Sequence, residues 1–316
     1  MLQNNPVKES GLQEEILEGL LAETRKLPSK LFYDERGSKL FDLICMLDEY
    51  YLTRTELRVM EENIQEIAGF IEGPETALIE LGSGSSFKTR LLFDNVKEFP
   101  LYIPVDISEE HLRKTAQKLR KDYPTLEVIP SAADYTKDLE APFENVPKDF
   151  KKVLYYPGST IGNFTQKELL MFLKNASRLL GHCGGFLVGL DLKKDPSILE
   201  KAYNDRENIT AAFNLNILER LNRDFGADFN VSNFSHKAVY NQNKGRIEMY
   251  LISRMVQTAH IFGRKIFFAK GDKILTEYSY KYDTDEFERL TQEYFRKGSI
   301  WTDENQYFSI MYMTAK

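Results

Sequence analysis

The sequence contains little cysteine, no long apolar run and no excess of basic charge. Cys45 and Cys183 are its only cysteines, and they lack the close spacing of a zinc site, so we expect neither a disulfide framework nor structural zinc. No apolar run approaches the ~20 residues of a membrane-spanning helix. The first residues lack the basic and apolar regions of a signal peptide. These absences predict a cytoplasmic protein that does not bind membranes.

The sequence also has few histidines and fewer basic than acidic residues. The four histidines (His111, His182, His236 and His260) show no ligand spacing such as HExxH, so structural or solvated roles are favoured and no metal is expected. The net charge of −6 argues mildly against a nucleic-acid partner, because proteins that bind a phosphate backbone usually carry a basic face. At 316 residues the chain is long enough for one large domain or two.

The most informative segment that is present runs from residue 77 to residue 90 and reads ALIELGSGSSFKTR. It predicts a strand, a tight glycine turn and a helix start, which lets the backbone approach a nucleotide-like ligand closely. A dinucleotide-binding turn would have glycine where Phe87 stands. Glu80, just before Gly82, would repel a phosphate but suits the ammonium and sulfonium of S-adenosylmethionine. The segment therefore favours a methyltransferase over a nicotinamide-dependent oxidoreductase.

Two further acids follow predicted strands. A strand over residues 101–108 contains Asp106, about 20 residues beyond the turn, where an acid usually meets ribose hydroxyls. A third strand, residues 126–130, precedes Asp134 and Tyr135, which suit the amine and the ring face of adenine. With Glu80, three acids thus follow successive strands, which indicates an adenosine-binding edge.

The order of predicted elements indicates an α/β fold with a doubly wound sheet. We expect a helix over 54–70, a helix capped by Thr165 and closed by Gly181, and a fifth strand over 184–192. Near the end, a helix over 283–295 precedes a hairpin that pairs residues 298–302 with 307–313 and returns to the main sheet.

The block from residue 193 to residue 280 changes pattern, with two helical stretches followed by alternating β-like runs. It is too long for a loop between core strands. We therefore expect a Rossmann-like class I methyltransferase domain of residues 57–192 plus 281–316. A second, α+β, substrate-binding or lid domain would comprise residues 1–56 plus 193–280.

Five segments, in this order, resemble the histidine-specific, S-adenosylmethionine-dependent Nα-methyltransferases of ergothioneine biosynthesis: Tyr33–Ser38, Glu49–Glu56, Glu80–Arg90, Gly158–Asn163 and Thr276–Ser279. The resemblance extends from about Leu31 to Lys316. It implies trimethylation of L-histidine at its α-amine to hercynine, with S-adenosylmethionine as co-substrate and no metal. A cytoplasmic monomer with no nucleic-acid partner is expected.

The resemblance also implies which residues contact each ligand. The cofactor would contact Gly82, Gly84 and Lys88 at the first turn, Asp106 at the ribose, Asp134 and Tyr135 at the adenine, and Gly158 near the methionine portion. Without the resemblance, a solvated first-turn lysine is favoured for Lys88 over a residue that binds the ligand's carboxylate.

Histidine would contact six residues: Tyr50, Asn163, Tyr203, Met249, Glu277 and Ser279. Asn163 and Tyr203 resemble the pair that binds the α-carboxylate. Glu277 and Ser279 stand two apart on a predicted strand, so they share a face and suit the two imidazole nitrogens. The alternatives are a polar pair on an edge strand and, for Tyr50 and Tyr203, aromatic residues at the edge of the core.

The implied reaction is an in-line displacement in which the neutral α-amine attacks the sulfonium methyl. Tyr50 is the catalytic candidate, as a proton relay with bound water and as an aromatic face for the quaternary product. Two alternatives stay open: methylation of another amino acid, such as a tryptophan derivative, and a catalytically silent protein that binds the same ligands. An indole offers one donor and no acceptor, so a Glu–Ser pair matches imidazole better.

Overall fold

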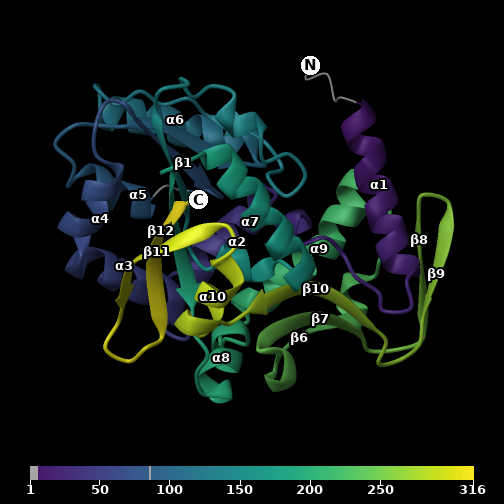
Figure 1. Cartoon of the computed structure of the whole chain (residues 1–316). Coiled ribbons are helices and arrows are strands. Elements are labelled where there is room, and N and C mark those ends of the chain that lie inside the picture. The colour runs from purple at the N-terminus through teal and green to yellow at the C-terminus, as the bar shows by residue number, and fades with distance from the viewer. Residues whose placement is uncertain (1–5, 85–86) are drawn as a thin grey trace. The chain divides into compact units, whose positions relative to one another are not determined.

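The computed structural model describes residues 6–84 and 87–316, so Ser85 and Ser86 of the glycine-rich segment lie outside the described residues. The chain divides into two compact units (Figure 1). The first unit comprises Met1–Tyr50 and Asp195–Ser279, and the second comprises Tyr51–Lys194 and Tyr280–Lys316. The chain therefore passes between the units three times.

The second unit is built on a seven-stranded sheet with the order β11-β12-β5-β4-β1-β2-β3. The strands from β1 to β5 run parallel, whereas β12 runs antiparallel to both β5 and β11. This arrangement confirms the doubly wound α/β sheet and the terminal hairpin that the sequence predicts. The strands are β1 (Thr76–Leu81), β2 (Leu101–Asp106), β3 (Ser131–Ala132), β4 (Lys151–Tyr156), β5 (Gly185–Asp191), β11 (Phe295–Thr302) and β12 (Phe308–Ala315).

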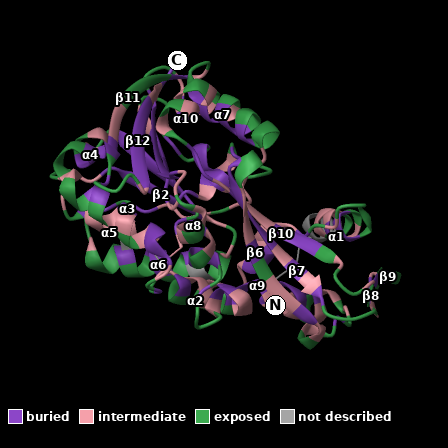
Figure 2. Ribbon diagram, turned by 90° about the horizontal axis from the view of Figure 1, so that it is seen from below, coloured by how far each residue is buried: buried purple, intermediate pink, exposed green. Residues whose placement is uncertain are grey.

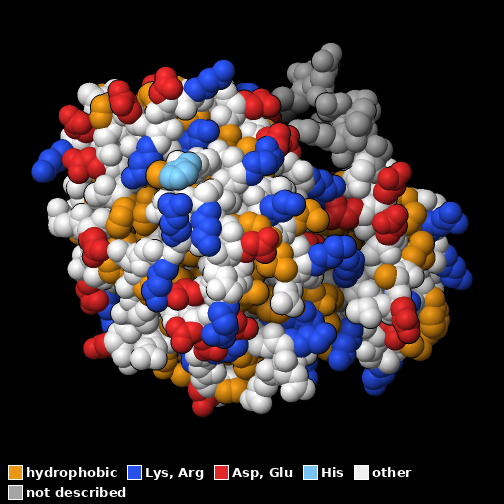
Figure 3. Space-filling view, in the orientation of Figure 1, with side chains coloured by type: hydrophobic (Ala, Val, Ile, Leu, Met, Phe, Trp, Pro, Cys, Tyr) orange, Lys and Arg blue, Asp and Glu red, His pale blue; other side chains and the backbone are white. Residues whose placement is uncertain are grey.

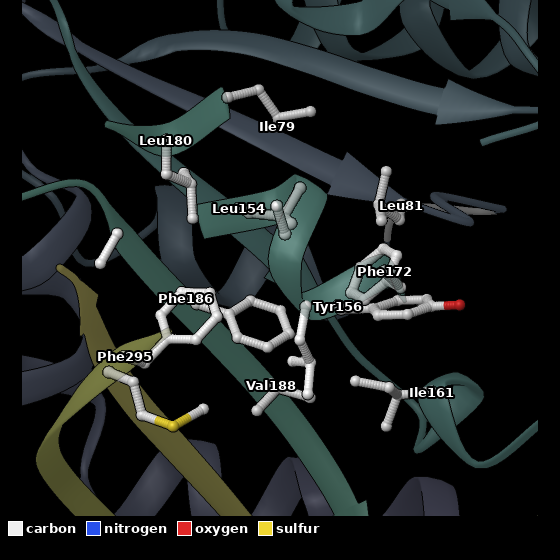
Figure 4. Close-up of a cluster of buried hydrophobic side chains, with 14 of the residues drawn as sticks. Ile79, Leu81, Leu154, Tyr156, Ile161, Phe172, Leu180, Phe186, Val188 and Phe295 are labelled. Atoms are coloured by element: carbon white, nitrogen blue, oxygen red, sulfur yellow. The ribbon is translucent and has the colours of Figure 1, made fainter. Parts of the chain in front are cut away.

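Both faces of this sheet are covered, so β1 and β5 are buried along their whole length, as is typical of parallel strands. Alternate residues of β1 enter two different cores, with Ile79 on one face and Leu78 on the other. Figure 4 shows part of the first core, where side chains of β1, β4 and β5 meet Phe172, Leu180 and Phe295. Figure 2 shows β12 mostly in the buried colour, β11 with intermediate and exposed residues, and exposed residues on the helices.

The helices of the second unit divide between the two faces of the sheet. On one side lie α7 (Gln166–Leu180) and α10 (Thr284–Thr291), and on the other lie α3 (Tyr51–Glu62), α4 (Ile64–Ile71), α5 (Phe87–Phe93) and α6 (Glu109–Asp122). Helix α7 begins where the sequence predicts, because Thr165 and Glu168 form a capping box, and Gly181 ends it.

The first unit combines helices with two small sheets. Its helices are α1 (Pro6–Leu21), α2 (Glu35–Ile44), α8 (Pro196–Tyr203) and α9 (Ile209–Phe225). A three-stranded sheet has the order β10-β7-β6, and β8 pairs with β9 in a hairpin. These strands are β6 (Phe234–Asn241), β7 (Arg246–Ser253), β8 (Gln257–Ile261), β9 (Arg264–Phe268) and β10 (Lys273–Tyr280).

Three predicted elements differ from the structure. The helix expected over 54–70 is two helices, because the backbone of Asn63 leaves helical geometry. The side-chain amide of Asn63 donates to the Val59 carbonyl 2.9 Å away. The third strand is β3, whereas residues 126–130 pair with β2 only through one parallel bridge between Val128 and Tyr102. The helix expected over 283–295 ends at Thr291, and Phe295 already belongs to β11.

The divisions between the units also differ from the expected domain boundaries. The structure divides the chain after residues 50, 194 and 279, whereas the sequence placed boundaries after residues 56, 192 and 280. A division at residue 56 would cut α3, whose buried residues begin at Tyr51 and Leu52 and continue to Val59 and Met60. The whole of α3 therefore belongs to the second unit.

Charges of both signs are mixed over the face of the molecule that Figure 3 shows. Lys and Arg side chains alternate with Asp and Glu over the face shown in Figure 3, in keeping with the net charge of −6. Among the described residues, none of the helices combines the length and the apolar character of a transmembrane segment.

Candidate functional site

The glycine-rich turn lies at the carboxyl ends of parallel strands in the second unit. Gly82 and Gly84 have φ angles of +69° and +46°, which glycine adopts without strain. The Gly82 N–H donates to the Val105 carbonyl 2.8 Å away, and the Gly84 N–H donates to Asp106 Oδ2 at 3.2 Å. Asp106 Oδ1 accepts from the Ser108 N–H at 2.9 Å. The turn after β1 is thus tied to the acid that ends β2.

Tyr135 approaches the same turn. Its ring meets the ring of Tyr156 edge-on with centroids 5.6 Å apart, and a Cβ at residue 82 would lie 3.9 Å from its hydroxyl oxygen. Burial raises the pKa of Tyr135 to about 12, so the phenol is neutral at ordinary pH. The neighbouring Asp134 accepts a hydrogen bond from the Thr136 N–H at 3.2 Å. Gly82, Gly84, Asp106 and Tyr135 therefore gather at one edge of the sheet.

Lys88 and Gly158 are joined by a residue that sequence reasoning missed. Glu56 on α3 is fully buried, forms an ion pair with the Lys88 ammonium and accepts the Gly158 N–H at 2.9 and 3.1 Å. Lys88 is only 19% exposed, so it is not the solvated lysine of the alternative interpretation. A Cβ at residue 189 would come within 2.6 Å of Glu56 Oε1, so glycine there leaves room for the carboxylate.

A signal for Glu56 was present in the sequence. It occupies the apolar stripe of an amphipathic helix, four residues after Leu52 and four before Met60, both of which are buried. A charged residue at such a position must find a partner inside the protein.

Glu80 is also held by donors from the protein. It is 2% exposed, and its carboxylate accepts hydrogen bonds from the hydroxyls of Thr89, at 2.5 Å, and Tyr102. The sequence interpretation placed this carboxylate beside a cationic ligand, whereas the hydrogen bonds described here come from β2 and α5. Burial raises the pKa of Glu80 to about 7.

In the first unit, four of the six candidate substrate residues interact. The Tyr203 hydroxyl and Ser279 Oγ are hydrogen-bonded at 2.9 Å, and the rings of Tyr50 and Tyr203 lie 6.1 Å apart in an edge arrangement. Burial raises the pKa of Tyr50 well above its ordinary value, and nearby Tyr203, Cys45 and Glu277 add to the effect. Tyr50 is therefore a neutral phenol that offers a hydrogen bond and a ring face.

The β10 strand carries the predicted Glu–Ser pair. Glu277 and Ser279 are two positions apart on this strand, so their side chains lie on the same face. β10 is an edge strand, as the alternative interpretation assumed, but Ser279 is 4% exposed and bonded to Tyr203 rather than solvated. Met249 is buried on the adjacent strand β7, where its carbonyl accepts from Thr276 Oγ1 at 3.1 Å.

His236 is hydrogen-bonded to the backbone of Tyr203. Its Nε2 lies 2.8 Å from the Tyr203 carbonyl and its Nδ1 lies 2.8 Å from the Asn214 amide nitrogen. Burial lowers the pKa of His236, so the neutral ring donates through Nε2 and accepts at Nδ1. This agrees with the structural role expected for the histidines.

Asn163, the sixth candidate, belongs to the second unit. It ends a short 3₁₀ helix, Thr160–Asn163, that follows β4. A Cβ at the preceding Gly162 would come within 2.6 Å of the Tyr280 carbonyl oxygen, so only glycine permits this approach. The candidate substrate residues are therefore divided between the units, five in the first and one in the second.

The fold and the glycine turn define a class of protein. A doubly wound sheet with a glycine turn after its first strand and acids after successive strands is the architecture of Rossmann-like, S-adenosylmethionine-dependent methyltransferases. The open backbone at Gly82 and Gly84, together with the acid at Asp106, fits an adenosine-bearing ligand. Within residues 6–84 and 87–316, no three His, Cys, Asp or Glu side chains come together in a way that suits a metal ion.

The chain belongs to the family of histidine-specific, S-adenosylmethionine-dependent methyltransferases, whose family model matches residues 12–315. It is 36% identical over 298 residues to a histidine N-alpha-methyltransferase of Mycolicibacterium smegmatis, covering 92% of this chain and 91% of that one. It is 33% identical to the protein of the same name from Mycobacterium tuberculosis, covering 93% and 91% of the two chains. Ergothioneine biosynthesis protein 1 of Neurospora crassa is 34% identical over 90% of this chain and 32% of its own length.

Glu80 predicts a pH-dependent contribution to stability. A carboxyl whose pKa is raised from 4.5 to about 7 on folding stabilises the native state fully below pH 4.5, and loses that contribution as pH rises from 4.5 through 7. At ~1.4 kcal/mol for each pH unit, about 2 kcal/mol of the loss falls between pH 5.5 and pH 8. Urea unfolding at pH 5.5 and pH 8 should show that Glu80→Gln gains stability relative to wild type at the higher pH. The exposed Glu127→Gln should follow wild type, and parallel curves for Glu80→Gln would contradict the assignment.

Glu56 predicts an effect on cofactor binding. Glu56→Gln removes the charge that pairs with Lys88, which frees the ammonium and loosens the Gly158 turn. We expect the Kd for S-adenosylhomocysteine, measured by calorimetry, to rise about tenfold, corresponding to ~1.4 kcal/mol. The exposed Glu61→Gln on the same helix should bind normally. An unaltered Kd in a folded Glu56→Gln protein would exclude Glu56 from the site.

Proposed function

We propose that this protein is an S-adenosylmethionine-dependent L-histidine Nα-methyltransferase that forms hercynine by three successive methyl transfers. The observation that carries the proposal is the cluster of Tyr50, Tyr203, Glu277 and Ser279 in the first unit, within a chain of this family. Relatives named as histidine methyltransferases share 33–36% identity over nearly the whole chain, which supports histidine over a tryptophan-derived substrate.

In this proposal each unit has its own task. The second unit is the methyltransferase domain, in which Gly82, Gly84, Lys88, Asp106, Asp134, Tyr135 and Gly158 bind S-adenosylmethionine. The first unit is the substrate-binding domain, in which Tyr50, Tyr203, Met249, Glu277 and Ser279 bind histidine. Asn163, a residue of the second unit, is a substrate contact that the family resemblance implies. Cytoplasmic location and a monomeric state stay predictions, and light scattering after gel filtration measures the latter.

The residues of the cluster match the chemical groups of histidine. A carboxylate at Glu277 accepts the imidazole N–H, and the Ser279 hydroxyl serves the second ring nitrogen, with Tyr203 holding that hydroxyl at 2.9 Å. The Tyr203 phenol offers a neutral hydrogen bond to the α-carboxylate, the group that the family resemblance also assigns to the Asn163 amide. This arrangement leaves the α-amine as the group to be methylated.

S-adenosylmethionine supplies an electrophilic methyl group bonded to sulfur. The chain's contribution is to orient the amine toward that methyl and to exclude water, since orientation supplies ~7–11 kcal/mol of barrier reduction. The amine loses a proton before each transfer. Tyr50, a neutral phenol at neutral pH, is the candidate that relays this proton from the amine to bound water. Its ring face stabilises the quaternary product by ~0.5–2 kcal/mol.

The function is tested by incubating the purified protein with S-adenosylmethionine and each free amino acid, followed by mass spectrometry. Histidine should gain one, two and then three methyl groups, whereas tryptophan should not. Methylation of another amino acid, with none on histidine, would overturn the proposed substrate.

The role of Glu277 is tested by comparing the KM for histidine with the Kd for S-adenosylhomocysteine in a Glu277 variant. Glu277→Ala removes a charged hydrogen bond worth ~1.5–3 kcal/mol, so the KM for histidine should rise about 10- to 100-fold. The Kd for S-adenosylhomocysteine should stay at the wild-type value, because the candidate cofactor residues lie in the other unit. Lys273→Ala, at the exposed start of β10, is the control, and equal losses for both ligands in Glu277→Ala would refute the assignment.

A further inference from the structure

One buried carboxylate gathers three buried donors at the end of β5. Asp191 is fully buried, and its Oδ1 accepts the Tyr51 hydroxyl at 2.6 Å and pairs with the Lys194 ammonium at 2.5 Å. Its Oδ2 lies 2.6 Å from the ammonium of Lys281, whose side chain is also fully buried. All four residues belong to the second unit. We call them the Asp191 cluster.

The three donors come from the three segments that connect the units. The chain passes between the units after Tyr50, after Lys194 and after Ser279. Tyr51 is the first residue after the crossing at Tyr50. Lys194 is the last residue before the chain enters the first unit again, and Lys281 is the second residue after the crossing at Ser279. A single carboxylate therefore holds every connection between the units at its end in the second unit.

These segments carry candidate site residues. Tyr50 directly precedes Tyr51, and Ser279 stands two residues before Lys281. The Asp191 N–H also donates to Ser159 Oγ at 2.9 Å, directly after Gly158 in the turn that follows β4. Along the chain, members of the cluster thus lie within two residues of the substrate candidates Tyr50 and Ser279. The Asp191 N–H also bonds the residue that follows the cofactor candidate Gly158.

The cluster is better suited to fixing geometry than to adding stability. Burial alone raises the pKa of Asp191, but the two ammonium groups outweigh it and hold this pKa below its ordinary value. Burial lowers the pKa of Lys194. Desolvating three charged groups costs several kcal/mol each, so buried ion pairs often add little net stability while requiring one exact arrangement of partners. The Lys194 ammonium also lies 4.6 Å from the centre of the Tyr51 ring.

We propose that Asp191 is a positioning residue that anchors the three crossings, and thereby limits how far the segments carrying Tyr50 and Ser279 move relative to the cofactor-binding edge. The kinetic part of its test rests on the proposed function, whereas the distance part does not.

The distance part uses spin labels on one residue of each unit. In the second unit the label is attached to Cys183, which is exposed. In the first unit it is attached to a cysteine introduced by Met46→Cys, at a position that is 76% exposed. Cys45→Ser removes the other native cysteine. Pulsed dipolar spectroscopy should show a broader distance distribution in Asp191→Asn and Lys281→Met than in the labelled parent. Lys193→Met is the matched control, because Lys193 pairs with Asp283 and Glu286 outside the cluster.

Two variants guard against a folding failure. Asp191→Asn removes the carboxylate that pairs with both ammonium groups, whereas Lys281→Met keeps Asp191 paired with Lys194. Lys281→Met therefore decides the test if Asp191→Asn does not fold. Unchanged distance distributions in the folded variants would overturn the proposal, even if the urea midpoint falls, because a purely stabilising role lowers the midpoint alone.

The kinetic part separates positioning from binding. In Asp191→Asn and Lys281→Met, kcat for histidine methylation should fall about 10- to 100-fold, the cost of misplaced reacting groups. The Kd for S-adenosylhomocysteine should change by less than about twofold, and Lys193→Met should retain wild-type kcat. A wild-type kcat in both cluster variants would overturn the proposal. If wild type does not methylate histidine, the proposed function fails while the distance measurement still decides the role of Asp191.

Discussion

A carboxylate that leaves water must find donors within the protein, and this constraint governs the ligand-facing edge of the second unit. Glu80 near the end of β1, Asp191 at the end of β5 and Glu56 on α3 are all buried, and each is held by protein hydroxyls, ammonium groups or backbone N–H groups. Because β1 and β5 run in the same direction, these acids organise one edge of the sheet. Of these acids, Glu56 positions the Gly158 turn and the Lys88 side chain.

The parts of the fold that sequence predicts are those fixed by local chemistry. Thr165, Glu168 and Gly181 determine where α7 begins and ends, and the apolar run of β5 needs both faces covered. The predicted helix over 54–70 was wrong because one side chain, Asn63, bonds back to the preceding turn. Apolar periodicity continues through such a break, since Ile67 stays in the core on the far side.

The candidate site shows the same division between local and long-range information. Spacing on a strand was enough to place Glu277 and Ser279 on one face, and glycines before a helix were enough to indicate the turn at Gly82. The pairing of Glu56 with Lys88 joins residues 32 positions apart, and that of Asp191 with Lys281 joins residues 90 apart. Hydrophobic patterns carry no information about such pairs. The local clue in each case is an acid at a position whose neighbours are buried.

The distribution of the candidate residues has a mechanistic consequence. Every candidate cofactor residue lies in the second unit, while the Tyr203–Ser279 pair and Glu277 lie in the first. Methyl transfer needs nitrogen, carbon and sulfur in line, so binding each ligand well is insufficient unless the connecting segments are constrained. Surface ion pairs hold such segments weakly because water competes for the charges. A buried acid that must keep its donors constrains them more strongly, and Asp191 is the acid that all three segments share.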